Sequence, residues 1–161
     1  MKKIIVIGCP GGGKSTFSRA LHEKTGIPLH YLDMVYWNAD KTKVNKDVFR
    51  SKLANILQEN SYIIDGNYRS TMEMRLQSCD TVFFLDYDTE TCISGVLSRM
   101  GKPREDMPWV ETEEDTDFTD YIKAFISENR PQIISLLETY SDKNIIIFKS
   151  REESAKYLET L

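Results

Sequence analysis

Residues 8 to 15 read Gly-Cys-Pro-Gly-Gly-Gly-Lys-Ser and match the pattern G-x-x-x-x-G-K-[ST]. Glycines in this pattern let successive backbone N–H groups converge on phosphate oxygens, and a helix that starts directly afterwards adds those of its first turn. The Lys14 ammonium can then reach the β- and γ-phosphates of a nucleotide, while the Ser15 hydroxyl can ligate Mg²⁺. We therefore predict that ATP and Mg²⁺ are bound by Gly11, Gly12, Gly13, Lys14, Ser15 and Thr16.

Two aspartates close short apolar segments that are typical of strands. Asp65 ends Tyr62-Ile63-Ile64, and such a carboxylate can hold the water shell of Mg²⁺, although an Asp-Gly pair is also a common turn. Asp33 ends the segment that starts at Leu29, where it could accept a proton or hydrogen bond from an acceptor hydroxyl, or simply cap a helix. Because parallel strands end at one sheet edge, both carboxylates are expected beside the glycine-rich loop.

Phosphoryl transfer also requires cations that follow the moving charge. Arginines occur after the Asp65 strand and on both sides of a later irregular segment. Tyr36 and Trp37, which closely follow Asp33, could line the wall of a pocket. We predict that Ser15 and Asp65 bind the metal ion. The residues predicted to take part in catalysis are Lys14, Asp33, Asp65, Arg99 and Arg104. Asp33, Arg69 and Arg75 are predicted to contact the substrate, and Arg130 is a further candidate cation.

The elements that must position these residues alternate between strands and helices, which favours an α/β fold with a mostly parallel sheet. Caps are predicted at Ser70, Asp88 and Ser150, and a helical break at Pro131. The predicted strands are 3–7, 29–33, 62–65, 81–86 and 144–148, and the predicted helices are 15–25, 45–60, a short one from 70, 88–100, 118–140 and one from 150.

Residues 102–117 show no periodicity and are rich in acids, so they predict a mobile loop; the acids from Glu105 to Asp120 are interpreted as a solvated face. At 161 residues the chain is expected to be one domain, with a lid at about residues 100–118. The net charge of −4 disfavours direct nucleic-acid binding. The three separated cysteines argue against a disulfide framework or zinc site, and no apolar run is long enough to cross a bilayer. The cytoplasm is the default location, and a monomer or weak dimer is expected.

Two segments resemble adenylate kinases: the glycine-rich loop, and Asp65-Gly66-Asn67-Tyr68-Arg69, which resembles their Asp-Gly-Phe-Pro-Arg. Over nearly its full length the chain is similar to the topology modulation protein family, the FlaR-like relatives of adenylate kinase. The matching residues are His30-Tyr31-Leu32-Asp33 with Trp37, Ile63 to Tyr68, Arg75, Arg104-Glu105-Asp106-Met107 and Asn129-Arg130-Pro131.

The resemblance implies a three-layer P-loop kinase fold with strand order 2-3-1-4-5 and a short lid after the helix that ends at Arg99. It implies that Arg69 contacts an acceptor phosphate and that Arg99 is one lid arginine; a second would align near Gly95, so its role is absent or moves to Arg104. The first hypothesis is an ATP-dependent kinase that phosphorylates a nucleotide or another small metabolite. The second is a nucleotide-binding regulator, with slow ATPase activity, that a partner recognises.

Overall fold

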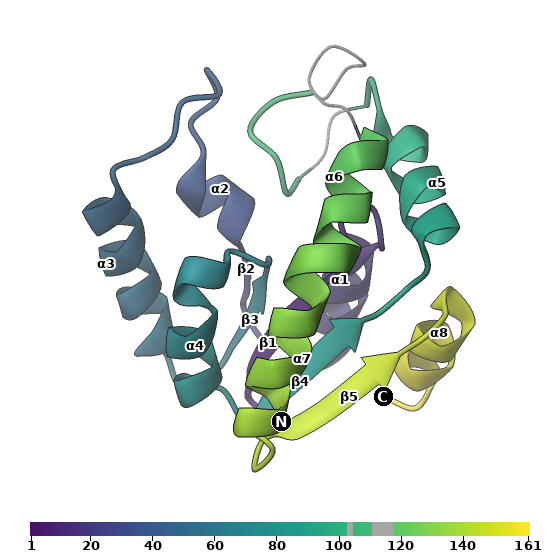
Figure 1. Cartoon of the computed structure of the whole chain (residues 1–161). Coiled ribbons are helices and arrows are strands. Elements are labelled where there is room, and N and C mark those ends of the chain that lie inside the picture. Colours follow the sequence, from purple (N-terminus) through teal and green to yellow (C-terminus); the bar gives the residue numbers. More distant parts are fainter. Residues whose placement is uncertain (103–104, 111–117) are drawn as a thin grey trace.

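The computed structural model describes residues 1–102, 105–110 and 118–161. Its centre is one sheet of five parallel strands in the order β2-β3-β1-β4-β5, which confirms the predicted fold (Figure 1). The strands are β1 (Lys3–Gly8), β2 (Leu29–Tyr31), β3 (Tyr62–Asp65), β4 (Thr81–Leu85) and β5 (Asn144–Phe148).

Burial follows the position of each strand in the sheet. The three central strands β3, β1 and β4 are buried along almost their whole length, because helices cover both faces of the sheet. Their continuous apolar runs are the reason that the sequence predicted them well. The edge strands β2 and β5 are only partly buried.

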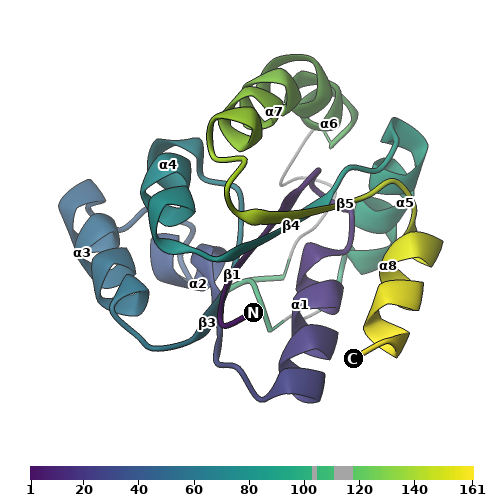
Figure 2. The same cartoon turned by 90° about the horizontal axis from the view of Figure 1, so that it is seen from below.

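Helices form a layer on each side of the sheet. Figure 2 shows α4 and α7 on one face and α1 with α8 on the other. The helices are α1 (Lys14–Thr25), α2 (Leu32–Tyr36), α3 (Lys46–Leu57), α4 (Arg69–Ser78), α5 (Thr89–Arg99), α6 (Phe118–Ala124), a π-helix (Phe125–Asn129), α7 (Arg130–Thr139) and α8 (Arg151–Glu159).

Local capping explains where several helices begin. Side-chain oxygens of Asp88 and Ser150 accept hydrogen bonds from backbone N–H groups of Thr91 and Glu153, as predicted. The predicted cap at Ser70 is wrong, because α4 begins one residue earlier. The residue that precedes α4 is Tyr68, which adopts a left-handed backbone with φ of 35°.

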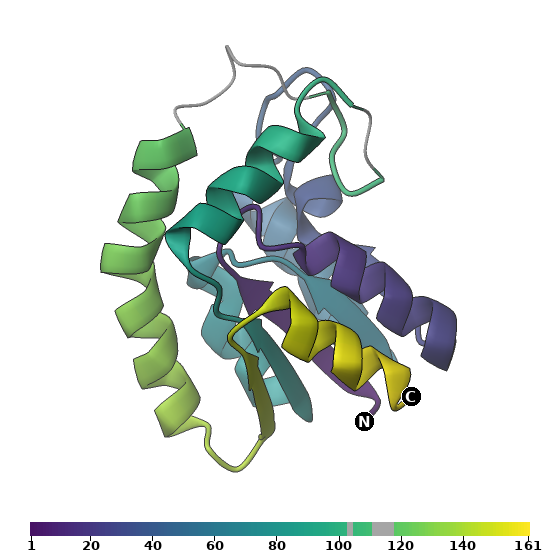
Figure 3. The same ribbon diagram turned by 90° about the vertical axis from the view of Figure 1, so that its right-hand side faces the viewer.

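Two predicted boundaries also change. Strand β2 ends at Tyr31, and the short helix α2 follows at once, so Asp33 lies in the first turn of a helix rather than at a strand end. The predicted break at Pro131 does not occur. Instead the helix continues through the π-helical segment into α7 (Figure 3). Pro131 is the second residue of α7, a position near a helix start where proline is tolerated.

The remaining expectations concern the lid and the membrane. Within the described ranges, no helix combines the length and apolar character needed to cross a membrane. Part of the predicted lid, including Arg104 and residues 111–117, lies outside the described residues.

Helix α5 packs directly against the glycine-rich loop. A Cβ atom on Gly95 would lie 1.8 Å from the carbonyl oxygen of Gly11, and a Cβ on Gly11 would lie 2.1 Å from the carbonyl oxygen of Cys92. Neither position can hold a side chain unless the helix or the loop moves. The close approach therefore fixes the loop against α5.

This contact predicts an inverted effect of a glycine-to-alanine change. Alanine in a helix interior is ordinarily about 0.5–1 kcal/mol more stable than glycine. We expect Gly95→Ala instead to lower the free energy of unfolding by about 1–3 kcal/mol, because the added methyl overpacks the contact. Urea unfolding measures this, with the exposed neighbour Ser94→Ala as the control that changes stability by less than about 0.5 kcal/mol. A more stable Gly95→Ala protein would contradict the packing argument.

Candidate active site

The glycine-rich loop joins β1 to α1, and the N-terminus of α1 has no side-chain cap from its N-cap residue. Gly13 precedes α1 in a left-handed conformation with φ of 89°, and no side chain caps the helix. The first-turn N–H groups of α1 and the positive end of its dipole are therefore available to an anion. The ammonium of Lys14 folds back to 3.4 Å from the carbonyl oxygen of Cys9. This arrangement fits the phosphates of a nucleotide.

Three oxygen-bearing side chains converge next to this loop. The Ser15 hydroxyl lies 2.7 Å from a carboxylate oxygen of Asp65 and 2.8 Å from one of Asp106. Oxygen ligands are what Mg²⁺ prefers, and Mg²⁺ usually completes its shell with water and substrate phosphates. The described residues contain no cluster of three or more His, Cys, Asp or Glu side chains that could hold a metal alone. The donor set fits Mg²⁺ that arrives with a nucleotide.

Asp65 is almost completely buried at the end of β3. Its neighbours in the sheet are Val6 on β1 and Tyr31 on β2, and only 5% of the residue is exposed. Burial raises the pKa of Asp65 to about 6, although the Lys14 charge and the Ser15 hydroxyl act in the opposite direction. A cation beside Asp65 would be attracted by a carboxylate that water screens only weakly.

Asp33 is oriented by a tyrosine from another element. The Tyr68 hydroxyl donates a hydrogen bond to Oδ1 of Asp33. Burial and the neighbouring Asp33 charge raise the pKa of Tyr68, so the phenol keeps its proton and remains the donor. The tertiary fold therefore gives Asp33 a fixed orientation that α2, a helix of five residues, could not provide alone.

Asn67 connects the β3–α4 loop to the glycine-rich loop. Its amide oxygen accepts from the backbone N–H of Gly8 at 3.0 Å, and its amide nitrogen donates to the carbonyl of the same residue at 2.7 Å. The two bonds satisfy both backbone groups of Gly8 at the point where β1 ends. Asn67 thus fixes the distance between the two loops.

Arg75 does not reach the solvent side of the site. It is fully buried on α4, and its guanidinium donates to the backbone carbonyls of Gly66, Asn67 and Tyr68. Burial lowers the pKa of Arg75 to about 10, which still leaves it charged at neutral pH. The predicted substrate contact of Arg75 does not agree with this geometry, because its guanidinium is buried and donates its hydrogen bonds to the carbonyls of the β3–α4 loop. Its place is that of a positioning residue.

Two cavities flank the Ser15 cluster. The first, of about 400 Å³, is lined by Gly11 and Gly13 of the loop and Thr16 of α1, together with Gly95 and Arg151; we call it the P-loop cavity. The second, of about 560 Å³, lies toward α2, α4 and α6; we call it the aromatic cavity. Ser15, Arg99 and Asp106 line both cavities, so two ligands would meet at these residues.

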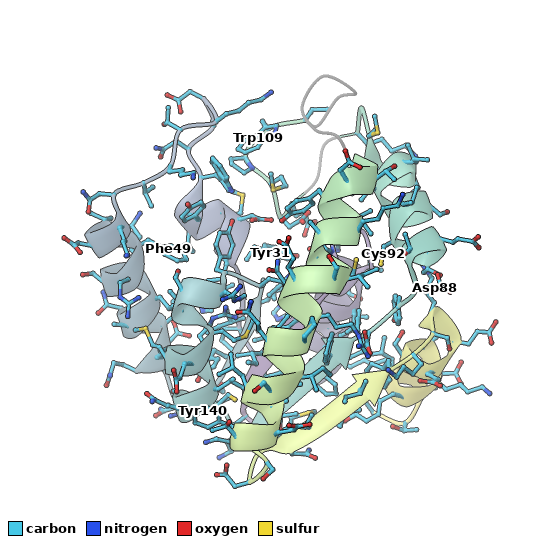
Figure 4. All side chains as sticks on the ribbon, in the orientation of Figure 1. Tyr31, Phe49, Asp88, Cys92, Trp109 and Tyr140 are labelled. Carbon is cyan, nitrogen blue, oxygen red and sulfur yellow. The ribbon has the colours of Figure 1, made fainter. Side chains whose placement is uncertain are left out.

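The lining of the aromatic cavity contains both polar side chains and aromatic rings. Figure 4 places Trp109 between the α2 side of the molecule and α6. The polar side chains include those of Lys14, Asp33, Asp65, Asn67 and Arg69, and the aromatic rings, which we call the aromatic wall, are those of Trp37, Tyr68, Trp109, Tyr121 and Phe125.

The structure therefore brings together most of the residues that the sequence singled out. Lys14, Ser15, Asp33 and Asp65 with Arg69 and Arg99 line the aromatic cavity, and Thr16 and two of the glycines line the P-loop cavity. Arg104 lies outside the described residues. Arg130 is instead paired with Asp86, to which it donates two hydrogen bonds of 2.8 Å.

Sequence reasoning missed Asp106 and most of the aromatic wall. Asp106 was interpreted as part of a solvated acidic face, but only 6% of it is exposed and it contacts Ser15. The available signal was its context, because Asp106 directly precedes the apolar Met107-Pro108-Trp109. Trp109, Tyr121 and Phe125 lie far from the glycine-rich loop in sequence, and only the fold brings them to it.

Comparisons with known proteins agree with this geometry at low sequence identity. No protein-family model matches the chain. The chain is 26% identical to the adenylate kinase of Mesomycoplasma hyopneumoniae, over 83% of this chain and 78% of that protein. It is 29% identical to the adenylate kinase of Encephalitozoon cuniculi, over 60% and 66% of the two chains. With the adenylate kinase of Thermotoga neapolitana it shares 28% identity, and the match spans only 39% of that protein.

Solved structures share the fold. Shikimate kinase from Acinetobacter baumannii, in complex with shikimate, has a TM-score of 0.66 at 14% identity, covering 99% of this chain and 92% of that one. Deoxyadenosine kinase from M. mycoides, with bound dATP, has a TM-score of 0.54 at 17% identity, covering 99% and 98%. These likenesses show that the chain shares the α/β fold of these structures, and its own sheet has the order 2-3-1-4-5.

The positioning role of Arg75 predicts a loss of stability. Arg75→Met removes a fully buried guanidinium and leaves three partly buried carbonyl groups without their donor, so we expect the free energy of unfolding to fall by about 3 kcal/mol. Arg75→Lys keeps the charge but not the planar guanidinium, so its free energy of unfolding should lie between those of the wild type and Arg75→Met. The matched control is Arg50→Met, because Arg50 also donates to a carbonyl of α4 but is exposed. Urea unfolding of all three variants is the measurement. An Arg75→Met protein of wild-type stability would restore the substrate-contact interpretation.

Proposed function

We propose that this protein is an ATP-dependent kinase that transfers the γ-phosphoryl group to a hydroxyl of a small molecule. The observation that carries the proposal is the pair of cavities that meet at Ser15, Arg99 and Asp106, one beside an uncapped helix N-terminus and the other containing the oriented Asp33. The curated relatives are adenylate kinases, and their similarity supports phosphoryl transfer as the reaction class. Assignment to the topology modulation protein family rests on the segments quoted from the sequence and belongs to the proposal.

In this proposal the phosphates of ATP lie in the P-loop cavity. The N–H groups at the start of α1 and the Lys14 ammonium bind the β- and γ-phosphates, and Arg99, between the cavities, faces the charge that moves. Mg²⁺, held through Ser15 and the water shell that Asp65 and Asp106 accept, would neutralise charge on the phosphates. Arg104 is proposed as a second lid arginine.

The acceptor lies in the aromatic cavity with its hydroxyl toward Asp33. The hydroxyl oxygen forms a bond to the γ-phosphorus while the bond from that phosphorus to the β–γ bridging oxygen breaks, and ADP leaves with that oxygen. The hydroxyl proton goes to the Asp33 carboxylate, which Tyr68 holds in place.

The first test is release of ADP from Mg-ATP with and without a panel of small alcohols and nucleotides. We expect one compound class to raise turnover, and Asp33→Asn to reduce this acceptor-dependent rate by about 10²–10⁴-fold while ATP binding persists. Lys14→Ala should abolish ADP release both with and without an acceptor. The matched controls are the exposed Asp142→Asn and Lys24→Ala, which should retain wild-type rates. ATP binding without stimulation by any compound would instead favour the nucleotide-binding regulator.

The Ser15 cluster predicts a specific dependence on Mg²⁺. Asp65→Asn removes a charged acceptor for metal-bound water, so the Mg²⁺ concentration for half-maximal turnover should rise about 10- to 100-fold at saturating ATP. Asp142→Asn should leave this concentration unchanged. If Asp65→Asn lowers the maximal rate without changing the Mg²⁺ requirement, Asp65 does not act through the metal.

A further inference from the structure

The aromatic wall is built from four separate parts of the chain. Trp37 follows α2, Tyr68 precedes α4, Trp109 lies in the 105–110 segment, and Tyr121 with Phe125 comes from the long helix. Trp37 and Trp109 pack edge to face, with ring centroids 5.4 Å apart. The wall therefore offers flat, apolar surfaces in fixed mutual orientation, which suit a planar ring better than a flexible polyol.

The described residues that line the aromatic cavity carry no surplus of positive charge. They supply three cations (Lys14, Arg69 and Arg99) and three carboxylates (Asp33, Asp65 and Asp106), so the formal charges cancel. A phosphate-bearing acceptor would bring negative charge next to Asp33, in a site where ATP already requires the cations. The buried Arg75 and the ion-paired Arg130 do not line this cavity. The balance of charge favours an uncharged acceptor over a nucleoside monophosphate.

The π-helical segment adds one polar group to the apolar wall. Tyr121, Phe125, Asn129 and Ile133 all line the cavity, although their spacing of four residues would drift around an ordinary helix of 3.6 residues per turn. The wider π turn over Phe125–Asn129 offsets that drift and keeps them on one face. Within residues 1–102, 105–110 and 118–161, the Asn129 amide has no side-chain hydrogen bond, so its donor and acceptor both remain for a ligand.

We propose that the acceptor is an uncharged nucleoside, and that Asn129 is a residue that determines which base is accepted. The base would lie against the aromatic wall, the sugar hydroxyl would face Asp33, and the Asn129 amide would pair with adjacent donor and acceptor groups on the base edge, as asparagine pairs with adenine. A cavity of about 560 Å³ is within the range of small-molecule sites. The proposal rests on the kinase function, which it narrows to one substrate class.

Binding can be measured without turnover, because the chain has two tryptophans and both line the aromatic cavity. Adenosine, cytidine, AMP and sorbitol are titrated into the wild-type protein and into Lys14→Ala, with excitation at the red edge of indole absorption, where bases absorb little. We expect saturable quenching by at least one nucleoside, binding of AMP at least tenfold weaker than that of adenosine, and no change with sorbitol.

Two pairs of variants test the wall and the amide. Trp109→Ala should weaken nucleoside binding about 5- to 100-fold, whereas Trp109→Phe, which keeps a ring, should weaken it less. Asn129→Leu should change the ratio of the adenosine and cytidine dissociation constants by about tenfold or more. Asn55→Leu, the same change on the exposed surface of α3, should leave that ratio unchanged.

The outcomes separate this inference from the kinase function. Nucleoside binding without ADP release, even with ATP present, would support the nucleoside site and overturn the proposed kinase activity. ADP release that is stimulated only by monophosphates or by non-aromatic alcohols would support the kinase and overturn the nucleoside proposal. Absence of quenching by every nucleoside, or an unchanged base preference in Asn129→Leu, would overturn the nucleoside site or the role of Asn129, respectively.

Discussion

The polar groups of the candidate site depend on how the three residues after Asp65 are held. The buried guanidinium of Arg75 donates to the carbonyls of Gly66, Asn67 and Tyr68, and thereby gives the β3–α4 loop one shape. From that loop Asn67 bonds both backbone groups of Gly8, and Tyr68 orients Asp33. One cation inside the protein thus positions groups that act on its surface, because its five donors span several carbonyls at once.

The left-handed backbone of Tyr68 follows from the same constraint. A positive φ is uncommon for a bulky residue, and here it places Tyr68 where its carbonyl accepts from Arg75 while its hydroxyl donates to Asp33. The surrounding hydrogen bonds stabilise a conformation that the isolated segment would avoid. The strained residue is itself part of the aromatic wall.

The site has two different kinds of surface, and this division supports a two-substrate reaction. The P-loop cavity combines the glycine-rich loop and a helix terminus with the cationic side chains of Arg19, Arg99, Lys102 and Arg151, and both kinds of group suit phosphate. The aromatic cavity is formed by side chains from distant segments, which can recognise shape and a base edge. Their common residues Ser15, Arg99 and Asp106 mark the place where a group could pass from one ligand to the other.

The sequence by itself determined the groups whose position follows from local rules. The glycine pattern and the buried strands around it predicted the loop, Lys14, Ser15 and Asp65, because parallel strands bring their ends to one edge. Only the tertiary structure decided the rest. An acidic residue in an irregular segment is predicted to be solvated, yet Asp106 is buried against Ser15. An arginine that follows a strand of the site is predicted to contact a ligand, yet Arg75 is fully buried. Burial and long-range pairing depend on which segments meet in space, and no local pattern contains that information.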